Sequence, residues 1–364
     1  MTETAAVAQK GRKEAVLDVD IYCGSATPTL ARAIAERLQR PLGRRDLHRF
    51  ADGECHVEIQ ESVRGRDIYI VQSTCYPVNE HLMELLVMID AFRRASAERI
   101  TAIIPYYGYA RQEKKSRGRE PITAKLVANL LTIAGADRVV SIDLHSPAIQ
   151  GFFDIGMVHL TAIPLLVNHL RIHIDLKDAV VVTPDTGRVK VADMYANLLN
   201  VPLVVMHKRR GGEHGQGVEV GAIVGSVEGK RPIIVDDLIS TGNTIYTCAQ
   251  ALLEAGAVPD ISVVATHGVF CSLTKRESID TPSVSGYPPS GTPGAPLQSA
   301  YERLGIPEIT RIVITDTIPA QSESLLAKTV VISIADLLAE TVMRLHQGRS
   351  ISALFRDWHE GYPV

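Results

Sequence analysis

The sequence has no excess of charge of either sign, since 38 Lys and Arg residues stand against 41 Asp and Glu residues, for a formal net charge of -3. This balance argues against a general nucleic-acid or membrane-surface binder, because such proteins carry a surplus of basic side chains. Any bound anion must therefore be held by a local arrangement of side chains and backbone N–H groups.

Long apolar runs are also missing, and no stretch has the length of a membrane-spanning helix. The N-terminus lacks the apolar core of a signal peptide, and residues 1–15 are small, polar and charged, which predicts a flexible tail. Cysteine is scarce: five residues are scattered along the chain without a Cys-x-x-Cys pair. That pattern suits a reducing cytosol better than a disulfide scaffold or a zinc site, so we expect a cytoplasmic protein.

The residues that are present predict an α/β fold. The length of 364 residues is enough for two domains with substantial cores. From residue 15 onward short aliphatic strands alternate with helical patterns, which predicts parallel sheets flanked by crossover helices. The expected strands are 17–23, 67–72, 100–105, 139–143, 179–183, 203–206, 233–235 and 261–266, and the expected helices are 28–38, 82–94, 121–135 and 333–346.

We expect two related domains, residues 16–162 and 163–337, with residues 338–358 joining the first. Small-residue junctions recur before several strands in both halves, which indicates related units. Two stretches interrupt the alternation. Residues 211–217 (GGEHGQG) should form a mobile loop, and residues 281–296, rich in Pro, Gly and Ser, should form an exposed insertion.

The most informative stretch is residues 232–244, PIIVDDLISTGNT. An aliphatic strand ends at Asp236 and Asp237, and a turn precedes a helix that starts near Ile245. Backbone N–H groups at a helix N-terminus, with hydroxyls beside them, suit a phosphate monoester, while two carboxylates can hold vicinal hydroxyls or a metal. The stretch therefore predicts a sugar-phosphate site, although two solvated acids on an ordinary strand–turn–helix connection would look similar. The turn residues are Ser240, Thr241, Gly242, Asn243 and Thr244.

Other strand ends carry candidate side chains. The turn Phe50, Asp52, Gly53 and Glu54 offers an aromatic face and acceptors for an adenine, although such turns are usually plain hairpins. A basic stretch that includes Arg111 and Gln112 follows another strand and could face phosphates or solvent. Asp143, His145 and Asp185 could hold a metal, and Lys208 and Arg210 precede the glycine-rich loop, where cations could stabilise a transferring phosphoryl group.

In order and spacing these motifs resemble one family, the ribose-phosphate diphosphokinases or phosphoribosyl diphosphate synthetases. The resemblance extends from residue 21 to residue 355 and includes FADGE, SVRGRDIYIVQS, DLHSPAIQGFFD and the stretch at 232–244. It implies two phosphoribosyltransferase-like domains, the substrates ATP and ribose 5-phosphate, the cofactor Mg²⁺, and a homo-oligomer, typically hexameric. Transfer of the β,γ-diphosphoryl group of MgATP to the C1 hydroxyl would give phosphoribosyl diphosphate and AMP, for nucleotide biosynthesis.

The resemblance also implies roles for the candidate residues. Phe50, Asp52, Gly53, Glu54, Arg111 and Gln112 would bind ATP; His145 and Asp185, with Asp143 nearby, would hold Mg²⁺; Lys208 and Arg210 would be catalytic; and Arg210, Asp236, Asp237, Ser240, Thr241, Gly242, Asn243 and Thr244 would bind ribose 5-phosphate. Three positions depart from the family pattern: many relatives have an acidic residue where Ser240 stands and a second glycine where Arg188 stands, and some have a serine where Gly118 stands. A phosphoribosyltransferase and a non-catalytic regulatory homologue are the alternative interpretations.

Overall fold

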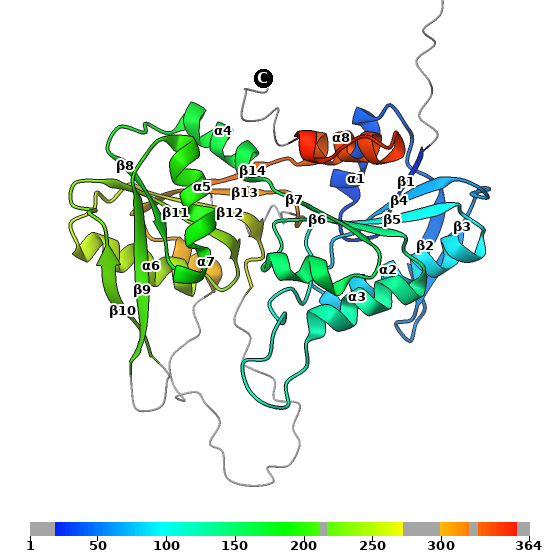
Figure 1. Cartoon of the computed structure of the whole chain (residues 1–364), viewed down its shortest axis with the longest axis horizontal. Coiled ribbons are helices and arrows are strands. Elements are labelled where there is room, and N and C mark those ends of the chain that lie inside the picture. Colours follow the sequence, from blue (N-terminus) through cyan, green and yellow to red (C-terminus); the bar gives the residue numbers. More distant parts are fainter. Residues whose placement is uncertain (1–18, 212–216, 272–298, 320–326, 355–364) are drawn as a thin grey trace, which may run out of the picture.

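The computed structural model describes residues 19–211, 217–271, 299–319 and 327–354. The expected N-terminal tail, the interior of the glycine-rich loop and the expected insertion at 281–296 lie outside these residues. The described chain forms two parallel sheets side by side, each with helices on both faces (Figure 1). The predicted α/β class is therefore confirmed. No helix in these ranges is both long enough and apolar enough to cross a membrane.

The first sheet contains five parallel strands in the order β1-β4-β5-β6-β7. Their bounds are β1 Val19–Cys23, β4 Asp67–Val71, β5 Arg99–Ile104, β6 Arg138–Ile142 and β7 Gly156–Leu160. Successive side chains of a strand point to opposite faces, and both faces are covered here, so these strands are apolar almost throughout. Ile21 packs toward helix α1 (Pro28–Arg37), whereas Tyr22 packs toward α2 (Val78–Arg94) and α3 (Thr123–Ala134).

The second sheet has seven strands in the order β10-β9-β8-β11-β12-β13-β14, and only the β9–β10 pair is antiparallel. One face is covered by α4 and α5, the other by α6 and α7. The strands are β8 Ala179–Thr183, β9 Leu203–Gly211, β10 Gly217–Val224, β11 Arg231–Ile239, β12 Ile261–Gly268, β13 Ile309–Thr315 and β14 Thr329–Ile332; the helices are α4 Ile163–His173, α5 Val189–Leu199, α6 Asn243–Glu254 and α7 Ala300–Leu304.

Three smaller elements complete the fold. An antiparallel hairpin, β2 (Arg45–Arg49) with β3 (Cys55–Ile59), follows α1, and short 3₁₀ helices η1 (Pro147–Phe152) and η2 (Thr186–Arg188) follow β6 and β8. The backbone of the Phe50–Glu54 turn thus connects the two strands of a hairpin, as the alternative interpretation expects.

The last helix, α8 (Ala335–His346), lies against α1 of the first domain (Figure 1). His346 of α8 contacts the buried carboxylate of Asp67 at 2.9 Å, and Asp67 also pairs with Arg99. One apolar cluster contains residues of α1 and α8 together with α4 and α5 of the second domain. This packing supports the proposal that the C-terminal segment belongs with the first sheet.

Several expected elements differ in length from the observed ones. The strand expected at 233–235 is β11, which continues to Ile239, because its pairing with β12 carries on through Asp236 and Leu238. The strand expected at 203–206 is β9, which extends to Gly211 because β10 pairs with it. The helix expected from residue 121 begins at Thr123.

We expect Leu338→Ala to lower the free energy of unfolding by about 2–5 kcal/mol, because it leaves a cavity in the cluster that joins α8 to both domains. Urea unfolding followed by circular dichroism measures the change. Gln347→Ala, at the exposed end of the same helix, is the control and should change stability little. Equal effects of the two substitutions would contradict this view of α8.

Candidate active site

The carboxyl ends of strands from both sheets meet at a buried polar junction. Asp143, which follows β6, accepts hydrogen bonds from the Thr266 hydroxyl of β12 at 2.6 Å and from the Ala162 backbone N–H at 3.0 Å. His267 of β12 is 3% exposed, and its Nε2 lies 3.1 Å from the Ile142 carbonyl oxygen. Burial lowers the pKa of His267, so the ring is neutral and donates from Nε2. The junction therefore fixes the strand ends of one sheet against those of the other.

Asp143 was expected near a metal, but its carboxylate binds within this junction. It lines a small cavity together with His145 and Asp237, whereas Asp185 lines a different, larger cavity. Both printed hydrogen bonds use Oδ2 of Asp143, so a role near a metal stays a prediction for this residue.

Beside the junction lies a cavity of about 550 Å³. It brings together most of the residues expected to bind ribose 5-phosphate and Mg²⁺, although they come from different sheets. The lining includes His145, Asp185, Arg188, Asp236, Asp237, the whole turn from Ser240 to Thr244, and Arg111 and Ser116.

The turn from Ser240 to Thr244 forms the start of α6. Gly242 has a φ of 71°, and a Cβ there would lie 3.2–3.3 Å from Leu304 and Ala300 of α7, so glycine is required. The Arg303 guanidinium donates to the Thr241 carbonyl at 2.8 Å, and the Cys271 N–H donates to the Ser240 carbonyl at 3.0 Å. These contacts hold the turn in place from behind.

The first turn of α6 is open to an anion. Its N-cap is Gly242, and no side chain caps the helix. The N–H groups of a helix's first turn have no partner within the helix, and the helix dipole adds partial positive charge there. The hydroxyl-bearing residues Ser240, Thr241 and Thr244 line the same cavity, so the donors that the predicted anion site needs are present together.

Asp236 and Asp237 are neighbours on β11, but their pKa values are shifted in opposite directions. Burial and the charge of Asp237 raise the pKa of Asp236 to about 8. Burial alone would raise the pKa of Asp237 too, but the hydrogen bond with His145 and the charge of Arg188 outweigh it and lower the pKa to about 2. At neutral pH Asp236 therefore carries a proton and Asp237 is ionised.

Arg188 is the residue whose role the sequence did not reveal. The sequence shows it only as a departure from the family pattern. Its side chain is 14% exposed, its Nη2 donates to Asp237 Oδ2, and the same atom lies 2.6 Å from His145 Nδ1. The sequence feature that could have indicated this role is the position of Arg188, three residues after the strand-end Asp185.

Asp185 and His145 lie at the cavity, as a metal site requires. One oxygen of Asp185 accepts from the Gly187 N–H at 2.9 Å, and the rest of this exposed carboxylate can bind a hard cation. Within the described chain, the contacts of His145 all use Nδ1, at 2.7 Å from Asp237 and 2.6 Å from Arg188, so Nε2 is the nitrogen that could hold a ligand. Since Mg²⁺ uses few protein ligands, these residues fit it.

Arg111 and Gln112 line a second cavity of about 710 Å³, with Tyr76, Asn79 and Tyr109 among its other lining residues. Arg111 lines both cavities, so it connects the two candidate binding regions. Residues 50–54 line neither cavity. Their turn is closed by the hydrogen bond from the Phe50 N–H to the Glu54 carbonyl, and the Phe50 side chain is 50% exposed.

The backbones of Lys208 and Arg210 lie on β9, opposite Val220 and Val218 of β10. Their side chains fall outside what the structure describes. The expected strand 203–206 therefore continues through residues 207–211, which pair with β10 in an antiparallel ribbon.

The charge of Asp236 gives a pH test for the protein without Mg²⁺ or substrates. An unfolded aspartate has a pKa of about 3.9, whereas folding raises that of Asp236 to about 8. The folded protein thus keeps a proton that the unfolded chain releases, so this residue makes stability fall as pH rises from about 4 to 8. Asp236→Asn, which resembles the protonated form, should reduce that fall in thermal unfolding scans.

Asp185→Asn, in the same cavity on an exposed turn, is the control and should keep the pH dependence of the parent protein. If Asp236→Asn keeps it as well, the proton is not on Asp236.

Three known domain families match successive parts of the chain. The N-terminal domain of ribose phosphate pyrophosphokinase matches residues 19–135, the phosphoribosyl transferase domain matches residues 161–319, and the phosphoribosyl synthetase-associated domain matches residues 291–356. The predicted pair of phosphoribosyltransferase-like domains is confirmed.

Individual relatives match over nearly the whole length. The ribose-phosphate pyrophosphokinase of Caldanaerobacter subterraneus is 47% identical over 335 residues, which cover 92% of this chain and 97% of that protein. A ribose-phosphate pyrophosphokinase of a Nostoc species is 44% identical over 92% of this chain and 93% of its own. The crystal structure of phosphoribosylpyrophosphate synthetase from Mycobacterium smegmatis is 41% identical, with a TM-score of 0.78, over 91% of this chain and 99% of that one. The chain therefore belongs to the ribose-phosphate pyrophosphokinase family, as its motifs predict.

Proposed function

We propose that this chain is a ribose-phosphate diphosphokinase, which transfers the β,γ-diphosphoryl group of MgATP to the C1 hydroxyl of ribose 5-phosphate. The products are phosphoribosyl diphosphate and AMP, for nucleotide biosynthesis. The observation that carries the proposal is the uncapped N-terminus of α6, which opens onto a cavity beside Asp236 and Asp237. A phosphate monoester and neighbouring hydroxyls are the groups that this arrangement recognises.

Ribose 5-phosphate binds, in this proposal, with its phosphate on residues 240–244 and its hydroxyls on Asp236 and Asp237. ATP binds in the neighbouring cavity lined by Arg111 and Gln112. Arg111 borders both cavities, and its charge lies where the transferring phosphates pass. A phosphoribosyltransferase would explain the first cavity but not the match of residues 19–135 to the N-terminal domain of ribose phosphate pyrophosphokinase, so that match favours the synthetase reaction.

Asp185 and Nε2 of His145 would hold Mg²⁺. The ion would supply positive charge against the negative charge that develops on the transferring phosphates. Lys208 and Arg210 would supply further positive charge to the transferring group, which needs positioning and electrostatic stabilisation more than covalent help.

The Phe50–Glu54 turn does not meet the ATP cavity of its own chain. A homo-oligomer, a hexamer by the family resemblance, would allow the turn of one subunit to meet the cavity of another. We place the enzyme in the cytoplasm, where its substrates and a reducing environment are found.

The activity test uses the purified full-length chain with MgATP and ribose 5-phosphate, and quantifies AMP and phosphoribosyl diphosphate by chromatography. We expect equal amounts of both products, and none when ribose 5-phosphate is omitted. Formation of ADP instead, or no turnover in a folded preparation, would refute the proposal.

Lys208→Ala and Arg210→Ala should each lower kcat by about 10²–10³-fold with a much smaller rise in the KM for ribose 5-phosphate, because their charges act mainly in the transition state. Arg209→Ala is the matched control, since neighbouring positions of a strand belong to opposite faces. Steady-state kinetics of the three variants make the comparison. Unchanged kcat in the first two would refute their catalytic role.

Asp237→Asn should weaken the binding of ribose 5-phosphate and leave ATP binding nearly unchanged, because the two substrates occupy different cavities. Calorimetric titration with each ligand separately measures both affinities. Gln112→Ala, in the other cavity, should show the opposite pattern. A selective loss of ATP affinity in Asp237→Asn would reverse the assignment.

A further inference from the structure

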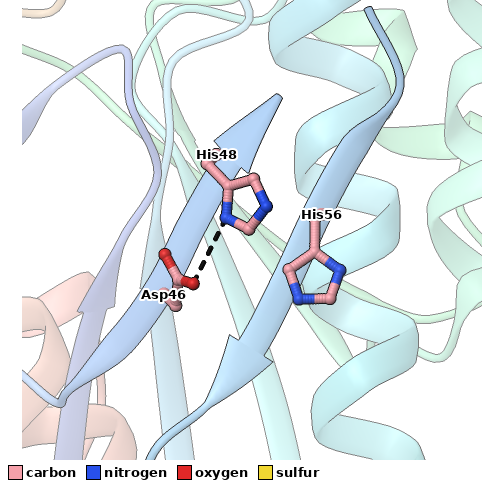
Figure 2. Close-up of side chains that lie close together, drawn as sticks. All are labelled: Asp46, His48 and His56. Carbon is pink, nitrogen blue, oxygen red and sulfur yellow. Dashed lines mark ion pairs between the residues drawn. The ribbon is translucent and has the colours of Figure 1, made fainter. Parts of the chain in front are cut away.

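The outward face of the β2–β3 hairpin carries three potential metal ligands that the proposed reaction does not use. Asp46 and His48 are two residues apart on β2 and therefore share a face. His56 of β3 is the direct cross-strand partner of His48. Val57, which points to the opposite face, packs into the apolar cluster under α2, so the three polar residues lie on the side away from that core (Figure 2).

These side chains point toward one another (Figure 2). His48 Nδ1 lies 3.2 Å from Asp46 Oδ2, and the two imidazole rings have their centroids 4.7 Å apart. One ligand atom from each of the three residues can be chosen so that all lie within 4.8 Å of one another. In the described part of the chain, no other group of three His, Cys, Asp or Glu residues meets this criterion.

The spacing is close to that of a tetrahedral site. With metal–nitrogen distances of about 2.0–2.1 Å, neighbouring ligand atoms in such a site lie about 3.3 Å apart. The Asp46–His48 pair already has this separation. Rotation of partly exposed side chains on a fixed hairpin can bring His56 the remaining distance.

We propose that Asp46, His48 and His56 bind one divalent transition-metal ion of the zinc class, with water in the fourth position. Two imidazoles and one carboxylate suit Zn²⁺ and its neighbours in the first transition row, whereas Mg²⁺ prefers a ligand set dominated by oxygen, most of it from water and substrate phosphates. The site is thus chemically distinct from the proposed Mg²⁺ site at Asp185. It shares no residue with either cavity.

The two proposed imidazole ligands also contact the Phe50 ring. The Phe50 ring centroid lies 5.4 Å from those of both His48 and His56, so fixing the two imidazoles restricts the phenyl ring as well. If Phe50 binds ATP, as the proposed function has it, bound metal changes the KM for ATP. The KM for ribose 5-phosphate stays the same.

Binding is tested without substrates, by titrating the full-length, metal-free protein with Zn²⁺ in a calorimeter and with Co²⁺ in a spectrophotometer. The titration buffer contains excess Mg²⁺, which occupies sites whose ligands are mainly oxygen. We expect one equivalent per chain, with the visible absorption of tetrahedral Co²⁺. His56→Gln and Asp46→Asn should each weaken binding by at least tenfold, since even the loss of an outer hydrogen-bond partner of a ligand costs about 10–100-fold.

The matched control is the double variant His169→Gln with His173→Gln. These two rings stack one turn apart on α4, with centroids 4.1 Å apart, and so form a close histidine pair away from the hairpin. The control should retain full binding, and all variants should unfold at the parent temperature without metal. Binding that survives His48→Gln with His56→Gln, or that disappears in the α4 variant, would overturn the proposal whatever the enzymatic activity proves to be.

Discussion

The structure depends on the buried junction where the strand ends of the two sheets meet. A neutral His267 donates to a carbonyl oxygen of the first sheet, and Asp143 accepts from Thr266 of the second. Buried polar groups are costly when unpaired, so each of these bonds favours a single relative position of the sheets. Cavity residues from both domains, such as His145 after β6 and Asp237 on β11, come within 2.7 Å of each other because of that position.

Most of the fold could be predicted from the sequence because strands buried on both faces have an unmistakable apolar pattern. β8 begins and ends where expected, and β6 differs from its prediction by one residue at each end. Several elements were not predicted, among them β7, β13, β14, α4 and α5, and the predicted strands are too short where pairing with a neighbouring strand overrides local composition. β11 continues through two aspartates because β12 lies beside it, and no local signal in residues 236–239 reveals this.

The candidate site was predictable where one segment supplies several groups, as the turn at 240–244 does. It was less predictable where a side chain has two plausible partners. Asp143 and Asp185 both follow strands, yet only Asp185 lines the cavity, and Arg188 gained a role through long-range contacts with Asp237 and His145. The outward cluster on the hairpin likewise depends on the cross-strand register of His48 and His56, which the sequence does not specify.

The charge balance of the cavity explains how two adjacent acids can coexist with a site for phosphorylated substrates. If both aspartates were ionised without compensation, their field would repel an anion at the nearby α6 N-terminus. Protonation of Asp236 removes one negative charge, and the Arg188 guanidinium neutralises the other on Asp237. The partial positive charge of the helix is then left to act on an anion. Arg188 and His145 both contact Oδ2 of Asp237, so one oxygen of this carboxylate carries the charge compensation that keeps it ionised beside Asp236.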